Sequence, residues 1–135
     1  MTEYILDTNI CIYIIKKIPE SVFNKFKELT PGSIGISSIT LAELQYGIDK
    51  SSKPGQNQEA LNQFLLPLEL LDFNTKAAIE YGRIRSALEK KGAPIGSLNM
   101  LPAAHAKSVG ALLVTNNVKE FNRVFGLLSK NWVKE

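Results

Sequence analysis

The sequence predicts an α/β protein with a central parallel sheet of four to five strands, covered by helices on both faces. Two observations support this fold class. Short apolar segments alternate with longer segments of helical periodicity along the chain, which is the pattern of a parallel sheet with crossover helices. The short segments are apolar nearly throughout, as is typical of strands that are buried on both faces.

Five segments have the composition of strands. The first ends in an acid, the second follows a Thr-Pro-Gly-Ser turn, and the last has the character of an edge strand. In chain order the expected strands are Tyr4–Asp7, Ile34–Ser37, Leu68–Leu71, Ala111–Val114 and Leu127–Trp132.

The intervening segments carry helix start and stop signals. Ser38 or Thr40 can cap the helix after the second strand, and Glu43 follows Thr40 at the spacing of a capping box. Thr75 is expected to cap a long helix, and Gly110 to close the next one. The expected helices are Asn9–Lys17, Pro19–Leu29, Ile39–Lys50, Gln58–Leu66, Thr75–Lys91, Leu98–Val109 and a turn at Asn117–Phe121, with loops at Lys50–Gln56 and Gly92–Gly96.

Length and composition narrow the class of protein. The 135 residues suit one domain, and a hydrophobic content of 44% argues against disorder. A single cysteine, Cys11, excludes a disulfide framework, and no apolar run approaches the roughly 20 residues that span a bilayer. The first residues lack the features of a signal peptide, so a cytoplasmic protein is expected. A net charge of +3 allows contact with nucleic acid without demanding it.

Acidic and amide side chains stand where they could meet at one rim of the sheet, since sites in such folds form beyond the carboxyl ends of the strands. In chain order these residues are Asp7, Glu43, Asn99, Asn116, Asn117 and Glu120. Carboxylates gathered without lysine or arginine repel one another unless a cation joins them. Oxygen ligands suit magnesium or manganese rather than zinc, and such a metal could activate water to hydrolyse a phosphodiester, with an acid as general base.

Simpler roles are open for four of these residues. Asp7 and Asn99 are good N-cap residues, Glu43 could be the far end of a capping box, and Asn116 could shape a turn. His105, the only histidine, lies within an alanine-rich helix and is expected to be structural.

The same segments resemble the PIN-domain toxins of the VapC family. The resemblance is carried by Tyr4–Tyr13, Ile36–Gly47, Pro94–Ala106, Leu113–Phe121 and Asn131–Trp132, in family order and over nearly the whole of residues 1–135. It implies a single PIN domain with three α/β/α layers and an endoribonuclease activity that depends on Mg²⁺ or Mn²⁺. It also implies a VapB-like antitoxin, a tRNA substrate with the initiator tRNA as a candidate, and a homodimer. Helices 19–29 and 39–50 would form the antitoxin groove.

The resemblance also assigns roles. The catalytic residues would be Asp7, Glu43, Asn99 and Glu120, and the metal ligands Asp7, Asn99, Asn117 and Glu120. Weaker candidates for contact with RNA are Thr115, Asn116, Arg83 and Arg85, the two arginines belonging to a basic helical stretch that could equally be a solvated face.

Asn99 departs from the family pattern, which has aspartate at this position as a metal ligand. Asparagine keeps a carbonyl oxygen but loses the negative charge, so metal affinity and activity should fall. An engineered change that allows a toxic chain to be produced would explain it, and so would a natural change in a weakened homologue; we favour the first. The alternative function is therefore a catalytically inactive PIN-fold module that binds an antitoxin or RNA. A receiver or phosphatase domain would want a second acid beside Asp7, where Thr8 and Asn9 stand.

Overall fold

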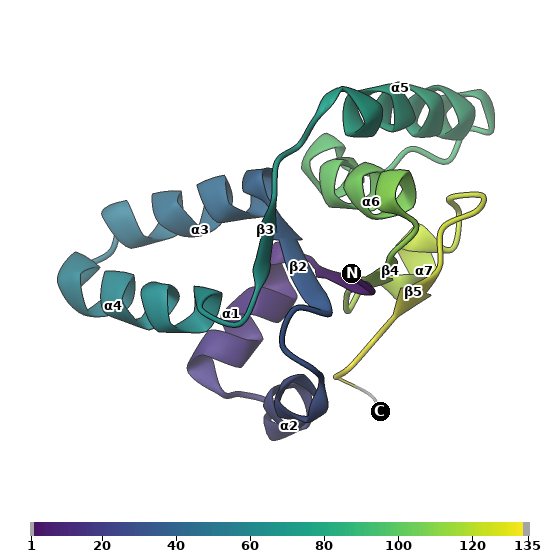
Figure 1. Ribbon diagram of the computed structural model, residues 1–135. Helices are drawn as coiled ribbons and strands as arrows, with labels where there is room; N and C mark the ends of the chain where they lie inside the picture. Colours follow the sequence, from purple (N-terminus) through teal and green to yellow (C-terminus); the bar gives the residue numbers. More distant parts are fainter. Residues whose placement is uncertain (1, 134–135) are drawn as a thin grey trace.

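A computed structural model describes residues 2–133, and its sheet contains five parallel strands in the order β3-β2-β1-β4-β5 (Figure 1). The strands are β1 (Tyr4–Leu6), β2 (Ile34–Ser37), β3 (Glu69–Leu71), β4 (Leu112–Val114) and β5 (Ser129–Lys130). The predicted α/β class, the parallel sheet and all five strands are confirmed, with the observed strands shorter at their ends.

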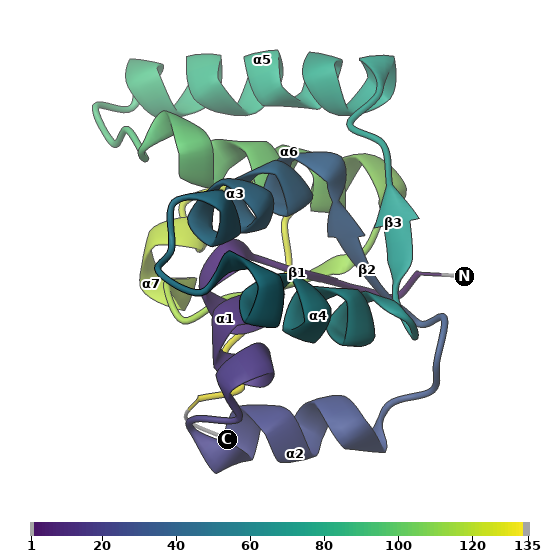
Figure 2. The ribbon, with the colours of Figure 1, turned by 90° about the vertical axis from the view of Figure 1, so that its left-hand side faces the viewer.

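Seven helices are seen in the described part of the chain. They are α1 (Thr8–Lys16), α2 (Glu20–Glu28), α3 (Ser38–Asp49), α4 (Pro54–Leu65), α5 (Thr75–Lys90), α6 (Ser97–Val109) and α7 (Val118–Phe121). Figure 2 shows α5 and α6 on one side of the sheet and α1, α2 and α4 on the other. The three layers expected from the sequence are therefore present. None of these helices is long and apolar enough to cross a bilayer.

Two apolar cores, one on each face of the sheet, explain why the central strands β1, β2 and β4 are apolar nearly throughout. Ile5 and Leu113 are paired across β1 and β4 and face the core under α5 and α6. Their neighbours Leu6 and Val114 are also paired and face the core shared with α1, α3 and α4. Successive side chains of a strand point to opposite faces, so a sheet covered on both faces needs apolar residues at every position. Each fully buried aliphatic side chain contributes about 1.5–3 kcal/mol.

The strand order changes direction at β1, which lies at the centre of the sheet. The path from β1 to β2 to β3 adds strands on one side, whereas β4 and β5 are added on the other side of β1. The helices after β1 and β4 therefore diverge at the carboxyl ends of these two strands, and this topological switch point is where such folds bind ligands.

Three predicted helix caps can be compared with the structure. Ser37, rather than Ser38 or Thr40, caps α3, and its hydroxyl accepts from the Ile39 amide. The predicted capping box with Glu43 is therefore wrong; the cap residue must have extended backbone, which Ser37 has as the last residue of β2. Asn74 caps α5 in place of Thr75 for the same reason. Gly110 closes α6 in the left-handed conformation, as predicted.

Two other local predictions were wrong. The loop predicted over 50–56 is shorter, because Pro54 stands in the first turn of α4, where a missing amide hydrogen costs nothing. The helix predicted to begin at Leu98 begins one residue earlier, at Ser97, and Pro102 lies inside it. It cannot donate the hydrogen bond that an interior residue normally makes to the carbonyl four positions earlier.

Candidate active site

Asp7 stands at the switch point and is held by three hydrogen bonds. Its backbone amide donates to the Val114 carbonyl at 3.1 Å, which continues the pairing of β1 with β4. Its Oδ1 accepts from the Ile10 amide at 2.9 Å, so it is the N-cap of α1. The Thr115 hydroxyl donates to the same carboxyl group. The capping role considered from the sequence is real, and it fixes the orientation of a carboxylate at the carboxyl end of the central strand.

The environment of Asp7 disfavours its charge. Burial raises the pKa of the Asp7 carboxyl group above its ordinary value, and the nearby Glu43 carboxylate raises it further. The hydrogen bonds from Thr115 and from the Ile10 amide lower the pKa, but burial outweighs them. An ionised Asp7 next to Glu43 therefore gains from any cation that enters the site.

Glu43 reaches the site from the middle of α3. Its Oε1 accepts a 2.8 Å hydrogen bond from the Thr8 hydroxyl in the first turn of α1. This bond joins two helices that follow different strands, and it uses one of the two carboxylate oxygens of Glu43.

A small cavity collects these groups. It has a volume of about 120 Å³ and is lined by Asp7, Thr8, Asn9, Glu43, Asn99 and Pro102. The lining contains two carboxyl groups, two amides and a hydroxyl, without a lysine or arginine. Its size admits water, and its oxygen-rich lining matches the preference of hard divalent cations such as Mg²⁺. Three of the predicted catalytic residues, Asp7, Glu43 and Asn99, are thus brought together.

The carboxylate content of this region is low for a metal site. Among residues 2–133, no group of three or more His, Cys, Asp or Glu side chains is gathered closely enough to hold a metal ion. Asn99 lines the cavity with an amide rather than a third carboxylate. Its amide carbonyl can still donate a lone pair but brings no charge.

The segment after β4 lies beside the cavity without lining it. Thr115 is fully buried; its hydroxyl donates to Asp7 and its oxygen accepts from the Asn117 amide at 3.0 Å. Asn116 donates from Nδ2 to the Tyr13 hydroxyl at 3.1 Å, while its buried Oδ1 has no hydrogen-bond partner within the described chain. Glu120 is half-buried in α7. Neither Asn117 nor Glu120 is among the residues that line the cavity.

The two arginines predicted to contact RNA are on the exposed surface of α5. Arg83 pairs with Glu80 at 3.4 Å, and Arg85 pairs with Glu89 at 3.2 Å. They line separate hollows on the α5 side of the molecule rather than the cavity around Asp7.

His105 is structural, as expected. It is buried in α6 and packs edge-on against Phe73, with ring centroids 5.5 Å apart. Burial lowers the pKa of its imidazole, which favours the neutral form.

Some residues of the site were not selected from the sequence. Thr8 and Asn9 line the cavity because they form the first turn of the helix that Asp7 caps, and the buried Pro102 forms part of its wall. Thr8 could have been selected from the sequence, because it directly follows Asp7, an acid at the end of a predicted strand. The bond from Thr8 to Glu43 spans 35 residues and had no signal in the sequence.

A larger groove begins at the same residues. It has a volume of about 290 Å³, and Thr8 and Glu43 line it as well as the cavity. The groove runs between α1, α3 and α4, with Ile12, Leu44 and Leu61 among its apolar lining residues. The groove expected from the sequence used helices 19–29 and 39–50; α3 does line it, whereas residues 19–29 do not.

Comparison with known proteins identifies the family. The PIN domain profile matches residues 4–126. The chain is 51% identical over 132 residues to Ribonuclease VapC2 of Rickettsia felis, covering 97% of this chain and 98% of that protein. It is 43% identical over 132 residues to the tRNA(fMet)-specific endonuclease VapC of Shigella flexneri, covering 98% and 99%.

A solved structure agrees with these sequence matches. The crystal structure of VapBC2 from Rickettsia felis, bound to a DNA fragment from its promoter, superposes with a TM-score of 0.89 at 48% identity, over 97% of this chain and 99% of that chain. The parallel sheet is thus that of a PIN domain, and the chain belongs to the VapC family of PIN-domain ribonucleases.

Proposed function

We propose that this chain is the toxin of a type II toxin–antitoxin module and an endoribonuclease that hydrolyses RNA phosphodiester bonds with Mg²⁺, or with Mn²⁺ in its place. The observation that carries the proposal is the cavity in which Asp7 and Glu43 meet without a lysine or arginine in the lining. Two carboxylates in a partly buried space are unfavourable unless a cation joins them. The VapC relatives named as ribonucleases support the same chemistry.

The residues present fit a metal with oxygen ligands. Asp7 has its Oδ1 engaged by the Ile10 amide, so its other oxygen is the better placed ligand. Asn99 offers a carbonyl oxygen in the same cavity. Asn117 and Glu120 are proposed to supply further oxygen ligands from the segment after β4, beside the cavity. When bound, the metal would polarise the phosphate and lower the pKa of a water.

The protein's own groups would then orient the reaction. The bond from Thr8 restrains Glu43, whose second oxygen is available to accept a proton from the attacking water. Thr115 is too deeply buried to meet a substrate, so we propose that it positions Asp7 and the Asn117 backbone. Asn116, with one amide oxygen unpaired, is a candidate contact for RNA.

The proposed substrate is a tRNA, with the initiator tRNA as the first candidate. The support comes from a relative, 43% identical over 98% of this chain, that is named a tRNA(fMet)-specific endonuclease. Sequence-specific recognition of RNA generally targets single-stranded loops, where bases are not stacked in a duplex, so we propose that an unpaired loop of the tRNA is the part recognised.

The proposed partner is a VapB-like antitoxin that binds in the groove between α1, α3 and α4. Solved VapBC complexes resemble this chain closely, at 44–48% identity. Because Thr8 and Glu43 line both the groove and the cavity, a peptide in the groove would reach the catalytic residues. Three statements remain predictions. They are that the chain forms a homodimer, that it is cytoplasmic, and that residues 1–135 form one domain.

Asn99 favours a second candidate function, a PIN-fold module that binds its antitoxin or RNA without cleaving. The cavity holds two carboxyl groups rather than three, which weakens both metal binding and the stabilisation of charge on the phosphate. The two candidates share the fold and the groove, and they differ only in whether RNA is cut.

Cleavage of total RNA by this chain and by its Asn99→Asp form, with Mg²⁺ and with a chelator, tests the proposal. The Asn99→Asp change should raise Mg²⁺-dependent cleavage by about 10²–10³-fold, the usual effect of one electrostatic catalytic group. An Asp7→Asn change in the same background is the control and should abolish the gain. Metal binding to the Asn99→Asp form without any cleavage would favour the binding module.

A further inference from the structure

A second hollow, distinct from the cavity around Asp7, is lined by several basic residues. It has a volume of about 210 Å³ and is formed by α5, the end of α6 and the segment after α7. Four cationic side chains surround it, namely Arg83, Lys91, Lys107 and Arg123, and no acid is among its lining residues. Of these residues, only Arg83 was considered above as a contact for RNA, and no function has been assigned to the hollow itself.

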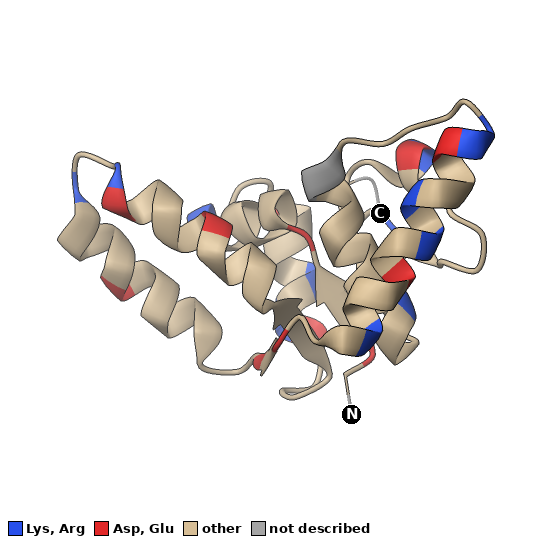
Figure 3. Cartoon of the chain, turned by 90° about the horizontal axis from the view of Figure 1, so that it is seen from above, with Lys and Arg blue, Asp and Glu red and all other residues tan. Residues whose placement is uncertain are grey.

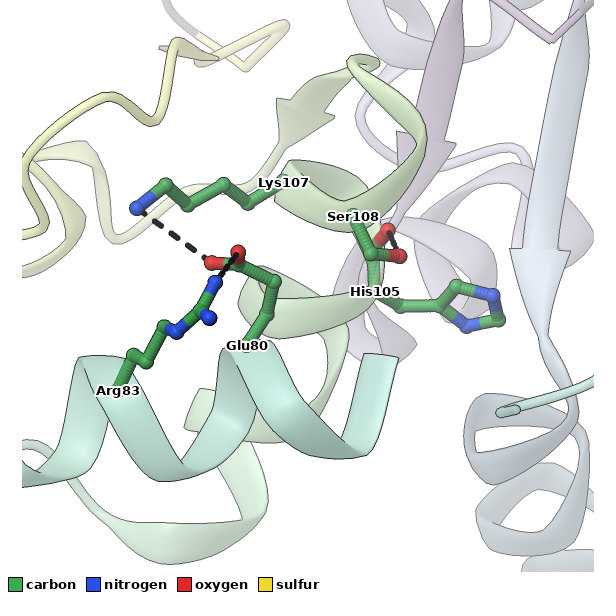
Figure 4. Close-up of polar contacts among 5 residues, drawn as sticks. All are labelled: Glu80, Arg83, His105, Lys107 and Ser108. Atoms are coloured by element: carbon green, nitrogen blue, oxygen red, sulfur yellow. Dashed lines mark hydrogen bonds and ion pairs between the residues drawn. The ribbon is translucent and has the colours of Figure 1, made fainter. Parts of the chain in front are cut away.

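The charge in this hollow is unusually concentrated. Figure 4 shows Glu80 between Arg83 and Lys107, at 3.4 Å and 3.5 Å from their nitrogens. Even when Glu80 is counted, the group carries three positive charges in excess, which equals the net charge of the whole chain. Figure 3 shows the contrast with α3 and α4, neither of which contains a lysine or arginine. Such a local excess attracts polyanions and is costly to maintain without one.

The hollow also has an apolar surface, on which the bases of RNA could pack. Its floor contains Ile84, Leu88 and Val124, and Phe125 stands at its rim with 86% of its surface exposed. Covering this exposed ring with an apolar partner would be favourable, because apolar surface would then be removed from water. Aromatic side chains beside a basic groove are typical of surfaces on which unpaired RNA bases stack.

The hollow is connected to the active site through α6 and a short loop. Lys107 follows Asn99 by eight residues on α6, a separation of about 12 Å along the helix axis. Arg123 donates from Nη1 to the Pro94 carbonyl at 3.5 Å, and Pro94 belongs to the loop that leads into α6. A strand of RNA that enters the cavity could therefore continue into the hollow within a few nucleotides.

We propose that this hollow binds the phosphodiester backbone of RNA next to the cleaved bond and that Phe125 stacks on an unpaired base there. The proposal rests on the RNA-cleaving function proposed above and adds an auxiliary contact that helps to select and hold the substrate. Elsewhere on α5, Arg85 is paired with Glu89, and the charge of that solvent-exposed pair is balanced. The hollow differs because its cations outnumber the acids in contact with them.

The test measures RNA binding apart from cleavage. A fluorescently labelled single-stranded RNA is titrated with the full chain in the presence of a chelator, at several salt concentrations. The double variant Lys91→Gln/Arg123→Gln should weaken binding by about tenfold at low salt. It should also reduce the slope of log affinity against log salt by roughly 0.7 for each lost phosphate contact.

A matched control variant is available on the same helix. Lys76→Gln/Lys90→Gln removes the same charge from exposed positions of α5 that do not line the hollow. It should leave the affinity and the salt slope nearly unchanged. Thermal unfolding of both variants verifies that they are folded. Phe125→Leu should weaken binding of the unpaired RNA, and Phe125→Tyr should restore it because the ring can still stack.

The outcomes separate this inference from the proposed function. If the unmodified chain binds no RNA, both the proposed function on RNA and this inference are wrong. If the unmodified chain binds RNA and both double variants bind equally well, the hollow has no role and the proposed cleavage function is untouched. A double variant of the hollow that keeps RNA affinity but loses binding to the antitoxin would overturn the inference in favour of an acidic protein partner.

Discussion

The Thr8 hydroxyl donates a 2.8 Å hydrogen bond to Glu43 Oε1, which ties the first turn of α1 to the middle of α3 at the entrance to the active site. Both residues line the cavity and the adjoining groove. The bond uses one carboxylate oxygen and restrains the other, so it determines how Glu43 is presented to a water in the cavity. We propose that Thr8 in this way positions Glu43, 35 residues away, as the general base.

Replacement of Thr8 by valine should reduce cleavage more than it reduces stability. Valine has nearly the same shape but cannot donate to Glu43, and misplacement of a catalytic group by even a small distance costs about ten- to hundredfold in rate. The measurement is cleavage in the Asn99→Asp background alongside thermal unfolding. Thr8→Ser keeps the hydroxyl and should keep most of the activity. Equal activity in the valine and serine forms would remove the positioning role.

Asp7→Asn should stabilise the metal-free protein at neutral pH. Burial and Glu43 raise the pKa of Asp7 above its ordinary value, so the folded state favours the protonated form. That contribution to stability is fully present below the unfolded pKa, near 3.8, and is lost as the pH rises through the raised folded pKa. The neutral asparagine removes this loss and remains a good N-cap for α1.

Thermal unfolding of the Asp7→Asn form and the unmodified chain in a chelator, over a range of pH, provides the measurement. The advantage of Asp7→Asn should shrink as the pH falls, because the unmodified carboxyl group becomes neutral. Added Mg²⁺ should raise the melting temperature of the unmodified chain more than that of the variant. An Asp7→Asn form that is less stable at neutral pH would contradict the assignment of burial as the dominant effect on Asp7.

Thr115→Val should destabilise the fold and shift the pH dependence of cleavage upward. Its buried hydroxyl donates to Asp7 and accepts from the Asn117 amide, so valine leaves this part-buried amide without its partner and the Asp7 carboxyl group with one hydrogen bond fewer. The expected loss is about 1–3 kcal/mol in the free energy of unfolding. Loss of the Thr115 bond also raises the pKa of Asp7 further, so activity should require a higher pH. Chemical denaturation and a pH–rate profile test both effects, with Thr115→Ser as the control.

Gly35→Ala and Gly82→Ala should have opposite effects on stability. A Cβ at Gly35 in β2 would lie 3.1 Å from the Glu69 carbonyl oxygen of β3, so the paired strands would have to separate. The expected loss is about 1–3 kcal/mol. A Cβ at Gly82 in α5 meets nothing within 4 Å, and alanine there should add about 0.5–1 kcal/mol through its higher helix propensity. Urea unfolding of the two variants measures both, and a stable Gly35→Ala form would mean that the edge strand β3 is easily displaced.

Local signals were sufficient to predict the order of elements and much of the candidate site. The apolar segments at residues 4–7, 34–37 and 111–114 predicted strands because a sheet covered on both faces needs apolar residues at every position. Asp7 ends the first strand and Asn99 opens the helix before the fourth strand, and both were predicted to fall on one rim of the parallel sheet. Cap positions were less predictable, because several polar residues compete at each helix start and the backbone conformation decides among them.

The sequence by itself determined the fold class, the family and three of the residues that meet in the cavity, Asp7, Glu43 and Asn99, because these follow from periodicity and from motifs that are local in the chain. Tertiary structure decided the contacts between distant segments: the bond from Thr8 to Glu43, the support of Asp7 by Thr115, and the groove between α1, α3 and α4. The basic hollow belongs to this second group, since Lys91, Lys107 and Arg123 come from three separate segments. The physical reason is that periodicity reports which face of an element is buried, whereas the partners on that face depend on how the helices cross over the sheet.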